Sequence, residues 1–115
     1  MPTPRPGGPV RGSATGRPLM AALDLFGRRW NLRILWELHL DGPLGFRPLR
    51  QACDGMSSSV LHQRLAELQE SLLVERGPGT DYRLTPLGRE ACAALSGLTH
   101  WSERWAAELK PRTRP

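Results

Sequence analysis

The chain has 115 residues with a formal net charge of +5, a length that suits one domain with a single core of modest size. No apolar stretch in the sequence approaches the roughly 20 residues that a membrane-spanning helix needs, and the N-terminus lacks the apolar segment of a signal peptide. We therefore expect a cytoplasmic protein without a membrane partner.

Catalytic and metal-binding patterns are missing from the sequence. The three histidines are scattered, and there is no HExxH motif, no carboxylate pair beside a histidine and no glycine-rich phosphate loop. Cys53 and Cys92 are far apart, without CxxC spacing, and neither has a base nearby in sequence. This pattern favours two buried thiols over a disulfide or a metal site. We expect no enzyme activity, no catalytic or metal-binding residues and no cofactor.

The positive charge is concentrated at the two ends of the chain. Residues 1–18 and 110–115 hold six Arg or Lys residues and no acid, whereas residues 19–109 hold ten Arg against eleven acids. Both ends are also rich in Pro, Gly or Arg and poor in large apolar side chains, so we expect them to be disordered. A solubilising role is favoured over a role as arms that bind phosphates. Residues 19–109 are expected to form the folded domain.

Within this domain the spacing of apolar residues first predicts three helices. Residues 18–26 have apolar positions at helical spacing, with Gly27 placed as a C-terminal cap. Residues 29–40 are apolar on several sides, which indicates a central helix. We expect Pro48 to start a third helix from a position in its first turn. This helix should end before the chain turns at residues 54–55.

The fourth helix, over residues 57–72, has a polar beginning. Ser57 is a strong N-cap candidate, and Met56 and Leu61 are placed for a hydrophobic staple. The spacing of Leu61, Leu65, Leu68 and Leu72 gives this helix a core-facing stripe. Two helices joined by a glycine-containing turn, the second with a polar outer face, form a helix-turn-helix arrangement.

Residues 73–85 change to a period of two, which predicts a two-stranded hairpin with a Pro-Gly turn, placed as a wing after the fourth helix. Thr85 and Pro86 then begin a long last helix. Its apolar stripe is too long for one small core to cover. We expect a dimer interface formed by the first and last helices, although the tryptophans could instead complete the monomer core. The expected interface residues are Leu19, Met20, Leu23, Leu98, Trp101, Trp105 and Leu109.

These segments together resemble the HxlR-type winged helix-turn-helix transcriptional regulators, a branch of the MarR-like proteins. The resemblance is carried by Gly27 with Trp30, by the serine-headed helix MSSSVLHQRLAELQ, by LLVER and by YRLTPLG, in that order. It covers about residues 19–109. It implies a mainly α (α+β) fold with a short two-stranded wing and a long C-terminal dimerisation helix, and a homodimer that binds a pseudo-palindromic operator.

Two features depart from the family pattern. Members that respond to thiol stress usually have a cysteine just before the first helix, but residues 13–19 read SATGRPL, so we do not expect such a redox switch. The wing turn, GPGTD, is short and has no basic residue. Arg76 or Arg83 would have to reach the minor groove from the strands.

The three serines suit a helix N-terminus that lies close to a DNA phosphate, because small side chains let the backbone N–H groups approach it. Gln63 can pair with adenine, and His62 can donate to a base or phosphate. For Arg64, contact with guanine or phosphate competes with a salt bridge to Glu67 or Glu70. The residues expected to contact double-stranded DNA are Ser57, Ser58, Ser59, His62, Gln63, Arg64, Arg76 and Arg83, together with Arg47 and Arg50 on the preceding helix.

The function that this pattern favours is a sequence-specific transcriptional regulator, with repression as the commoner mode for a small protein without an activation domain. The alternative is a winged-helix module that binds a protein or a ligand and has weakened DNA binding, which the near-neutral folded domain and the short wing would suit. A small-molecule effector fits either reading. Its expected pocket lies near Trp30, Trp36 and Trp101, between the central helix and the dimer helices.

Overall fold

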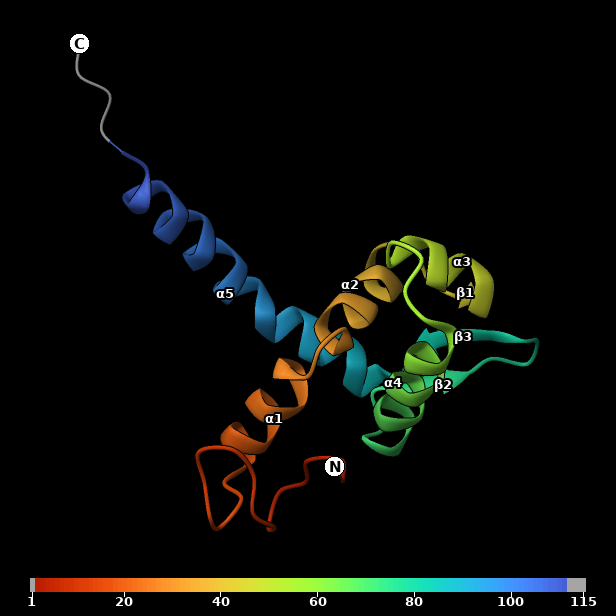
Figure 1. The fold of residues 1–115 in the computed structure, drawn as a ribbon, viewed down its shortest axis with the longest axis horizontal. Coiled ribbons are helices and arrows are strands. Elements are labelled where there is room, and N and C mark those ends of the chain that lie inside the picture. The colour runs from red at the N-terminus through yellow and green to blue at the C-terminus, as the bar shows by residue number, and fades with distance from the viewer. Residues whose placement is uncertain (1, 112–115) are drawn as a thin grey trace.

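The structure, a computed structural model, describes residues 2–111 (Figure 1). Helices α2, α3 and α4 and a small sheet form a rounded body, from which α5 projects in one direction and α1 in another. In chain order the elements are α1 (Pro18–Gly27), α2 (Asn31–Asp41), β1 (Leu44–Gly45), α3 (Phe46–Ala52), α4 (Ser58–Glu70), β2 (Val74–Arg76), β3 (Asp81–Leu84) and α5 (Pro86–Leu109).

Side-chain caps begin α4 and α5, as the sequence predicts. The Ser57 hydroxyl accepts a hydrogen bond from the Val60 N–H at 3.4 Å, and the Thr85 hydroxyl accepts one from the Gly88 N–H at 3.0 Å. Each bond satisfies an N–H that has no partner within its helix. Gly88 is required for packing as well, because a Cβ there would lie 2.1 Å from the Leu73 carbonyl oxygen.

The third helix begins earlier than predicted. Helix α3 starts at Phe46, two residues before Pro48, which therefore lies in the first turn instead of starting the helix. Proline is tolerated there because the first N–H groups of a helix have no acceptor within the helix.

The predicted hairpin of β2 and β3 is present, but the sheet has a third strand. Strand β3 lies in the middle and pairs antiparallel with both neighbours, so that Tyr82 faces Leu44 of β1 and Arg76 of β2. Strand β1 has two residues, too few for an alternating pattern to be recognised in the sequence. It connects the sheet to the beginning of α3.

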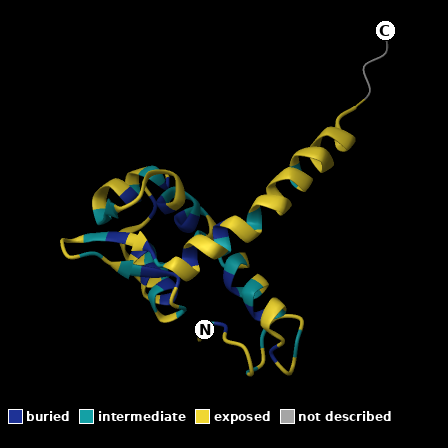
Figure 2. Ribbon diagram, turned by 180° about the vertical axis from the view of Figure 1, so that it is seen from behind, coloured by how far each residue is buried: buried dark blue, intermediate teal, exposed yellow. Residues whose placement is uncertain are grey.

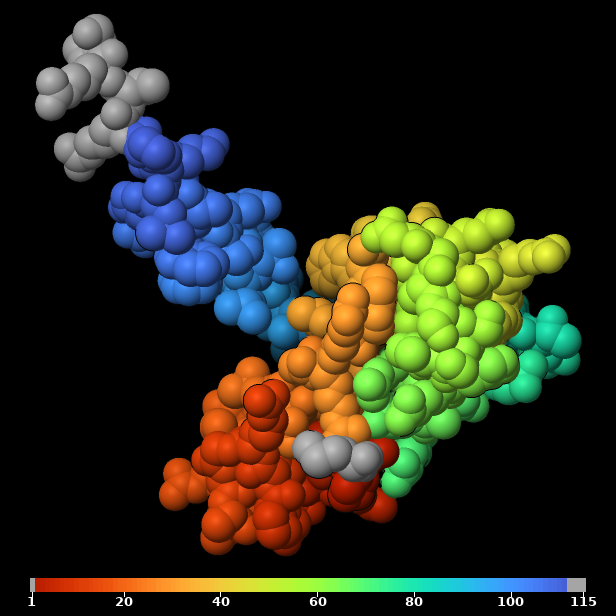
Figure 3. Space-filling view, in the orientation of Figure 1, coloured from red at the N-terminus to blue at the C-terminus, as the bar shows by residue number. Residues whose placement is uncertain are grey.

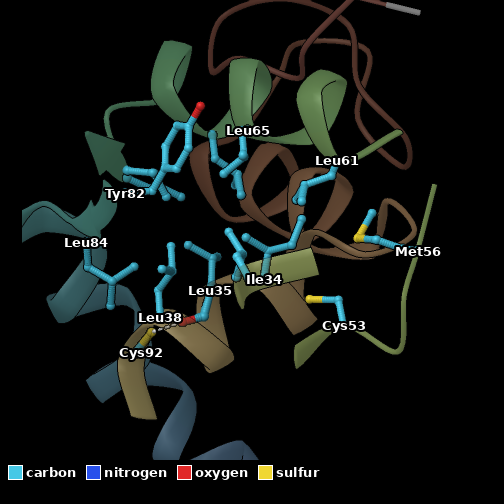
Figure 4. Close-up of a cluster of buried hydrophobic side chains, with 14 of the residues drawn as sticks. Ile34, Leu35, Leu38, Cys53, Met56, Leu61, Leu65, Tyr82, Leu84 and Cys92 are labelled. Atoms are coloured by element: carbon cyan, nitrogen blue, oxygen red, sulfur yellow. Dashed lines mark hydrogen bonds between the residues drawn. The ribbon is translucent and has the colours of Figure 1, made fainter. Parts of the chain in front are cut away.

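The core lies between α2, α4 and β3 (Figure 4). Leu61 and Leu65 of α4 point toward Ile34 and Leu35 of α2, and Tyr82 lies beside them. The predicted stripe on α4 is correct up to Leu68 and wrong at Leu72, which lies outside the helix and is 66 % exposed. Leu72 has a φ of 65°. This left-handed residue reverses the chain after the helix, so Leu73 turns toward the core instead.

Residues 2–17, called the N-terminal segment below, lie beside α1, and several local hydrogen bonds link them. The Gly7 N–H donates to the Gly16 carbonyl at 3.0 Å, and the Ser13 hydroxyl accepts from the N–H groups of Gly16 and Arg17 at 3.1 Å each. These turns depend on local hydrogen bonds and on glycines with positive φ. Of the expected C-terminal tail, residues 112–115 lie outside the described residues.

Burial is uneven along α5 (Figure 2). Its first turns contain the buried Gly88 and Cys92, and its second half is exposed almost throughout. At 1.5 Å per residue, 24 residues extend about 36 Å, farther than the small body can cover. Over residues 2–111, none of the helices is long and apolar enough to cross a membrane.

Candidate nucleic-acid interface

The outer face of α4 is polar and fully open to solvent. Ser58, Ser59, His62 and Gln63 are all exposed, while Leu61 and Leu65 on the opposite face are buried in the core. The helical period separates the two sets, because residues three and four apart share a face. The structure therefore brings these predicted contact residues together on one surface.

The beginning of α4 carries short side chains only. The Ser57 hydroxyl caps the helix and lies 3.0 Å from the Ser59 hydroxyl. The N–H groups of Ser58 and Ser59 belong to the first turn and have no acceptor within the helix. Together with the positive end of the helix dipole, they form a surface suited to an anion such as a DNA phosphate.

His62 is held by an aromatic neighbour. Its ring stacks on Phe46, the first residue of α3, with ring centroids 4.1 Å apart and planes inclined by 21°. Within residues 2–111 its ring nitrogens make no hydrogen bond, so they are available to an external partner. The stack also fixes α4 relative to α3, a contact that the sequence pattern did not indicate.

Arg64 takes the salt bridge that the sequence left open as an alternative. One guanidinium nitrogen lies 2.6 Å from Glu67, which is only 6 % exposed and also accepts from Arg28 at the junction of α1 and α2. The Arg64 Nε is buried without a hydrogen-bond partner in the described chain. Arg64 is thus half-buried beside the polar face of α4, and a contact with DNA would require it to leave Glu67.

The turn between α3 and α4 is fixed by two arginines. Arg50 Nε donates to the Met56 carbonyl at 2.6 Å, and Arg33 donates to the Ala52 carbonyl at 2.7 Å and to Asp54 at 3.2 Å. Arg50 is half-buried, which makes its role in the free protein structural, whereas Arg47 is exposed. The role of Arg33 in this turn was not predicted, because Ala52 and Asp54 lie 19 and 21 residues away from it along the chain; its third partner, Glu37, is on its own helix.

The wing residues are exposed and already engaged. The Arg76 guanidinium lies 5.1 Å from the centre of the Tyr82 ring, a cation–π contact. Arg83 pairs with Glu75 across the hairpin at 3.1 Å. The turn between the strands, residues 77–80, carries no basic side chain. Any wing contact with DNA would therefore come from the strands.

The residues expected at a dimer interface form an exposed apolar surface on α1 and α5. Exposure ranges from 49 % at Leu23 to 69 % at Leu19, and the set also includes Leu98, Trp101, Trp105 and Leu109. Trp101 and Trp105 stack with their centroids 5.6 Å apart. The alternative in which they complete the monomer core does not hold, because both are more than half exposed. Met20 is half-buried and lies beside Gly12 of the N-terminal segment.

The expected effector pocket corresponds in part to a groove between α2 and α5. This groove has a volume of about 440 Å³, and Trp36 lines it together with Leu32, Leu95 and Leu98. Trp30 and Trp101 do not line it. Of the three tryptophans expected near the effector, Trp36 thus lines a groove between α2 and α5, and the location of an effector site stays a prediction.

The two cysteines are buried free thiols, as the sequence predicts. Cys53 is 0 % exposed and Cys92 is 1 % exposed, and burial raises the pKa of both thiols because it disfavours the charged thiolate. The Cys92 thiol faces the Leu35 carbonyl at 3.9 Å. Buried neutral thiols are poor nucleophiles.

Known proteins with this arrangement are transcription regulators. The HxlR-like helix-turn-helix family matches residues 25–110. The HTH-type transcriptional regulator YodB of Bacillus subtilis is 32 % identical over 91 residues, which cover 74 % of this chain and 80 % of YodB. The HTH-type transcriptional regulator YvaP of the same species is 31 % identical over 90 residues, covering 73 % of this chain and 82 % of YvaP.

Solved structures agree with these relatives. The quinone-bound YodB of B. subtilis has a TM-score of 0.70 at 31 % identity, covering 76 % of this chain and 97 % of YodB. A MarR-family regulator from Enterococcus faecalis V583 has a TM-score of 0.72 at 34 % identity, covering 79 % of this chain and 87 % of that one. The chain therefore belongs to the HxlR-like helix-turn-helix family and has the DNA-binding fold of its transcription regulators.

Proposed function

We propose that this protein is a cytoplasmic, sequence-specific repressor that binds a pseudo-palindromic operator as a homodimer, with α4 as the recognition helix in the major groove. The observation that carries the proposal is the exposed polar face of α4, which begins with three serines and contains His62 and Gln63. A major groove admits a helix, and hydrogen-bonding side chains on its outer face can read base edges.

Each group on this surface has a distinct role in the proposal. Ser57, Ser58 and Ser59 let the helix N-terminus approach a phosphate, and Gln63 reads an adenine. His62, oriented by Phe46, donates to a base or phosphate. The exposed Arg47 binds the DNA backbone.

The other arginines have partners within the free protein. Arg50 holds the turn before α4, and Arg64 holds α4 through Glu67. Arg76 and Arg83 reach the minor groove only by leaving Tyr82 and Glu75. We therefore expect DNA affinity to fall with salt, but less steeply than for a protein whose folded domain is strongly basic.

The homodimer is supported by the exposed apolar surface of α1 and α5. A monomer would leave two stacked tryptophans and four leucines in water, and large apolar side chains exposed in this way are typical of subunit interfaces. A twofold dimer would present two copies of α4, which matches a pseudo-palindromic operator.

Regulation by a small molecule is part of the proposal. YodB has been crystallised with a quinone bound. In this chain the two thiols are buried and residues 13–19 contain no cysteine, so we propose that an effector binds without covalent thiol chemistry.

The experiment is a fluorescence anisotropy titration of the protein with duplex DNA from upstream of its own gene and with a scrambled duplex, at two salt concentrations. We expect tighter binding to the upstream duplex, and we expect Gln63→Ala to reduce that preference about 5- to 100-fold, the effect of losing one bidentate base contact. Gln69→Ala is the matched control, because Gln69 lies six residues further along α4, near the end of the helix.

Two results would contradict the proposal. Equal, weak and steeply salt-dependent binding to both duplexes would mean that the basic ends are the only DNA contact. That outcome would favour the winged-helix module that binds a protein or ligand. A monomer in light scattering at micromolar concentration would remove the symmetric operator.

A further inference from the structure

A second cavity, of about 470 Å³, lies between the N-terminal segment, α1 and the first turns of α5. Its wall is mainly apolar, with Leu25 and Phe26 from α1, Leu73 from the start of the hairpin and Ala91 from α5. Pro4, which is buried, and Pro6 line it from the N-terminal segment. Figure 3 shows this segment, in red, lying against α1. Small-molecule sites typically have volumes of roughly 300–1,000 Å³ and predominantly apolar walls.

One polar atom in this wall has no partner. The Ser71 hydroxyl is buried and makes no hydrogen bond within residues 2–111, and Ser71 lines the cavity. Buried hydroxyls are nearly always hydrogen-bonded, because an unpaired one has lost its water without replacement. Ser71 thus brings one hydroxyl that has no partner among the described residues to the wall of a mainly apolar cavity. Arg5 and Glu90, both exposed, also line it with opposite charges, so neither an anion nor a cation is favoured.

We propose that this cavity binds a neutral, mainly hydrocarbon small molecule whose single hydroxyl or carbonyl group pairs with Ser71. A helix from a second copy is a less suitable occupant, because Pro4 and Pro6 of the chain's own N-terminal segment already line the cavity beside α1. The groove beside Trp36 is a better site for a second copy of the chain. It includes Leu98, a residue of the exposed surface on α1 and α5, and would be continuous with a dimer interface.

The cavity is also connected to α4. The Thr3 hydroxyl, next to Pro4, donates to Glu70 in the last turn of α4 at 2.9 Å. Arg28 bonds both the Pro2 carbonyl and Glu67 of the same helix. A molecule that contacts Pro4 therefore acts on a segment tied to the proposed recognition helix. This regulatory consequence rests on the proposed DNA-binding function, whereas the binding site does not.

Binding is tested by isothermal titration calorimetry with 2-naphthol, a neutral two-ring molecule with one hydroxyl group. We expect saturable binding to the full-length protein and at least tenfold weaker binding to Ala91→Phe, whose larger side chain fills the cavity. The matched control is Ala93→Phe. Ala93 is exposed and lies about 200° around α5 from Ala91 at roughly 100° per residue. The Ala93→Phe variant should therefore bind 2-naphthol as tightly as the wild type.

A second variant tests the polar contact without filling the cavity. Ser71→Ala should weaken 2-naphthol binding about three- to tenfold, the usual effect of one hydrogen bond, and should leave the binding of naphthalene unchanged when both are measured by ligand-observed NMR. Equal losses for the two molecules would overturn the assignment of Ser71.

Other outcomes would overturn the cavity proposal itself. These are absence of saturable 2-naphthol binding, equal affinity in Ala91→Phe and Ala93→Phe, or a change of oligomeric mass in Ala91→Phe alone, which would assign the cavity to a subunit contact. If 2-naphthol binds but changes the Kd for upstream DNA less than twofold, the regulatory consequence is refuted. The Gln63→Ala comparison tests DNA reading independently of all these results.

Discussion

Replacement of Glu67 by glutamine tests whether the buried charge cluster holds the proposed recognition helix in place. Glu67 is 6 % exposed and pairs with both Arg28 and Arg64, whose side chains are 13 % and 18 % exposed. Breaking a buried ion pair from one side costs about 3–5 kcal/mol. Glutamine retains one accepting oxygen, which recovers about 1 kcal/mol, and the partial exposure of the arginines lets water reach them.

We therefore expect Glu67→Gln to lower the free energy of unfolding by about 2 kcal/mol. That change is a factor of roughly 30 in the folding equilibrium and lowers Tm by about 8–16 °C for a small domain. The assay is urea and thermal unfolding followed by circular dichroism at fixed protein concentration, because the stability of an oligomer depends on concentration.

The matched control is Glu70→Gln, one turn further along α4. Glu70 is exposed and accepts a hydrogen bond only from the Thr3 hydroxyl among the described residues, so its replacement should change stability by less than about 0.5 kcal/mol. If Glu67→Gln is as stable as Glu70→Gln, the cluster does not hold α4, and the structural role assigned to Arg64 is refuted.

Three further predictions concern the cap, the thiols and the wing. Ser57→Ala should cost about 1 kcal/mol in urea unfolding, because it removes the N-cap of α4, and a Ser58→Ala variant with the same loss would refute the capping role. Burial raises the pKa of Cys53 and Cys92, so the unfolded chain loses these protons first as pH rises. The free energy of unfolding should therefore fall above about pH 8.5, with a shallower slope in the Cys53→Ala/Cys92→Ala double variant; identical slopes would count against this. Arg76→Ala should weaken binding to upstream DNA less than tenfold in anisotropy titrations, since the guanidinium must first leave its ring contact, and a larger loss would mean that the wing is a major DNA contact.

Local patterns in the sequence determined most of the secondary structure. Ser57 and Thr85, each followed by apolar residues at helical spacing, predicted the starts of α4 and α5. They could do so because an N-cap acts on a backbone N–H only three residues away. The alternation of side chains around GPGT predicted the hairpin of β2 and β3, because that pattern too lies within a few neighbouring residues. The order of these elements was sufficient to recognise the family, and the polar outer face of α4 could be read from its helical period.

Only the tertiary structure decided features that depend on residues distant in the chain. Strand β1 is too short to have a pattern and exists because β3 pairs with it. Glu67 pairs with Arg64, three residues away, and also with Arg28, 39 residues away, and only the fold brings Arg28 to it. Leu72 faces solvent because its own left-handed backbone conformation reverses the chain after α4. The cavity beside Ser71 needs walls from four separate segments. The sequence thus fixes what each segment prefers by itself, whereas the fold decides which polar groups meet and which remain without a partner.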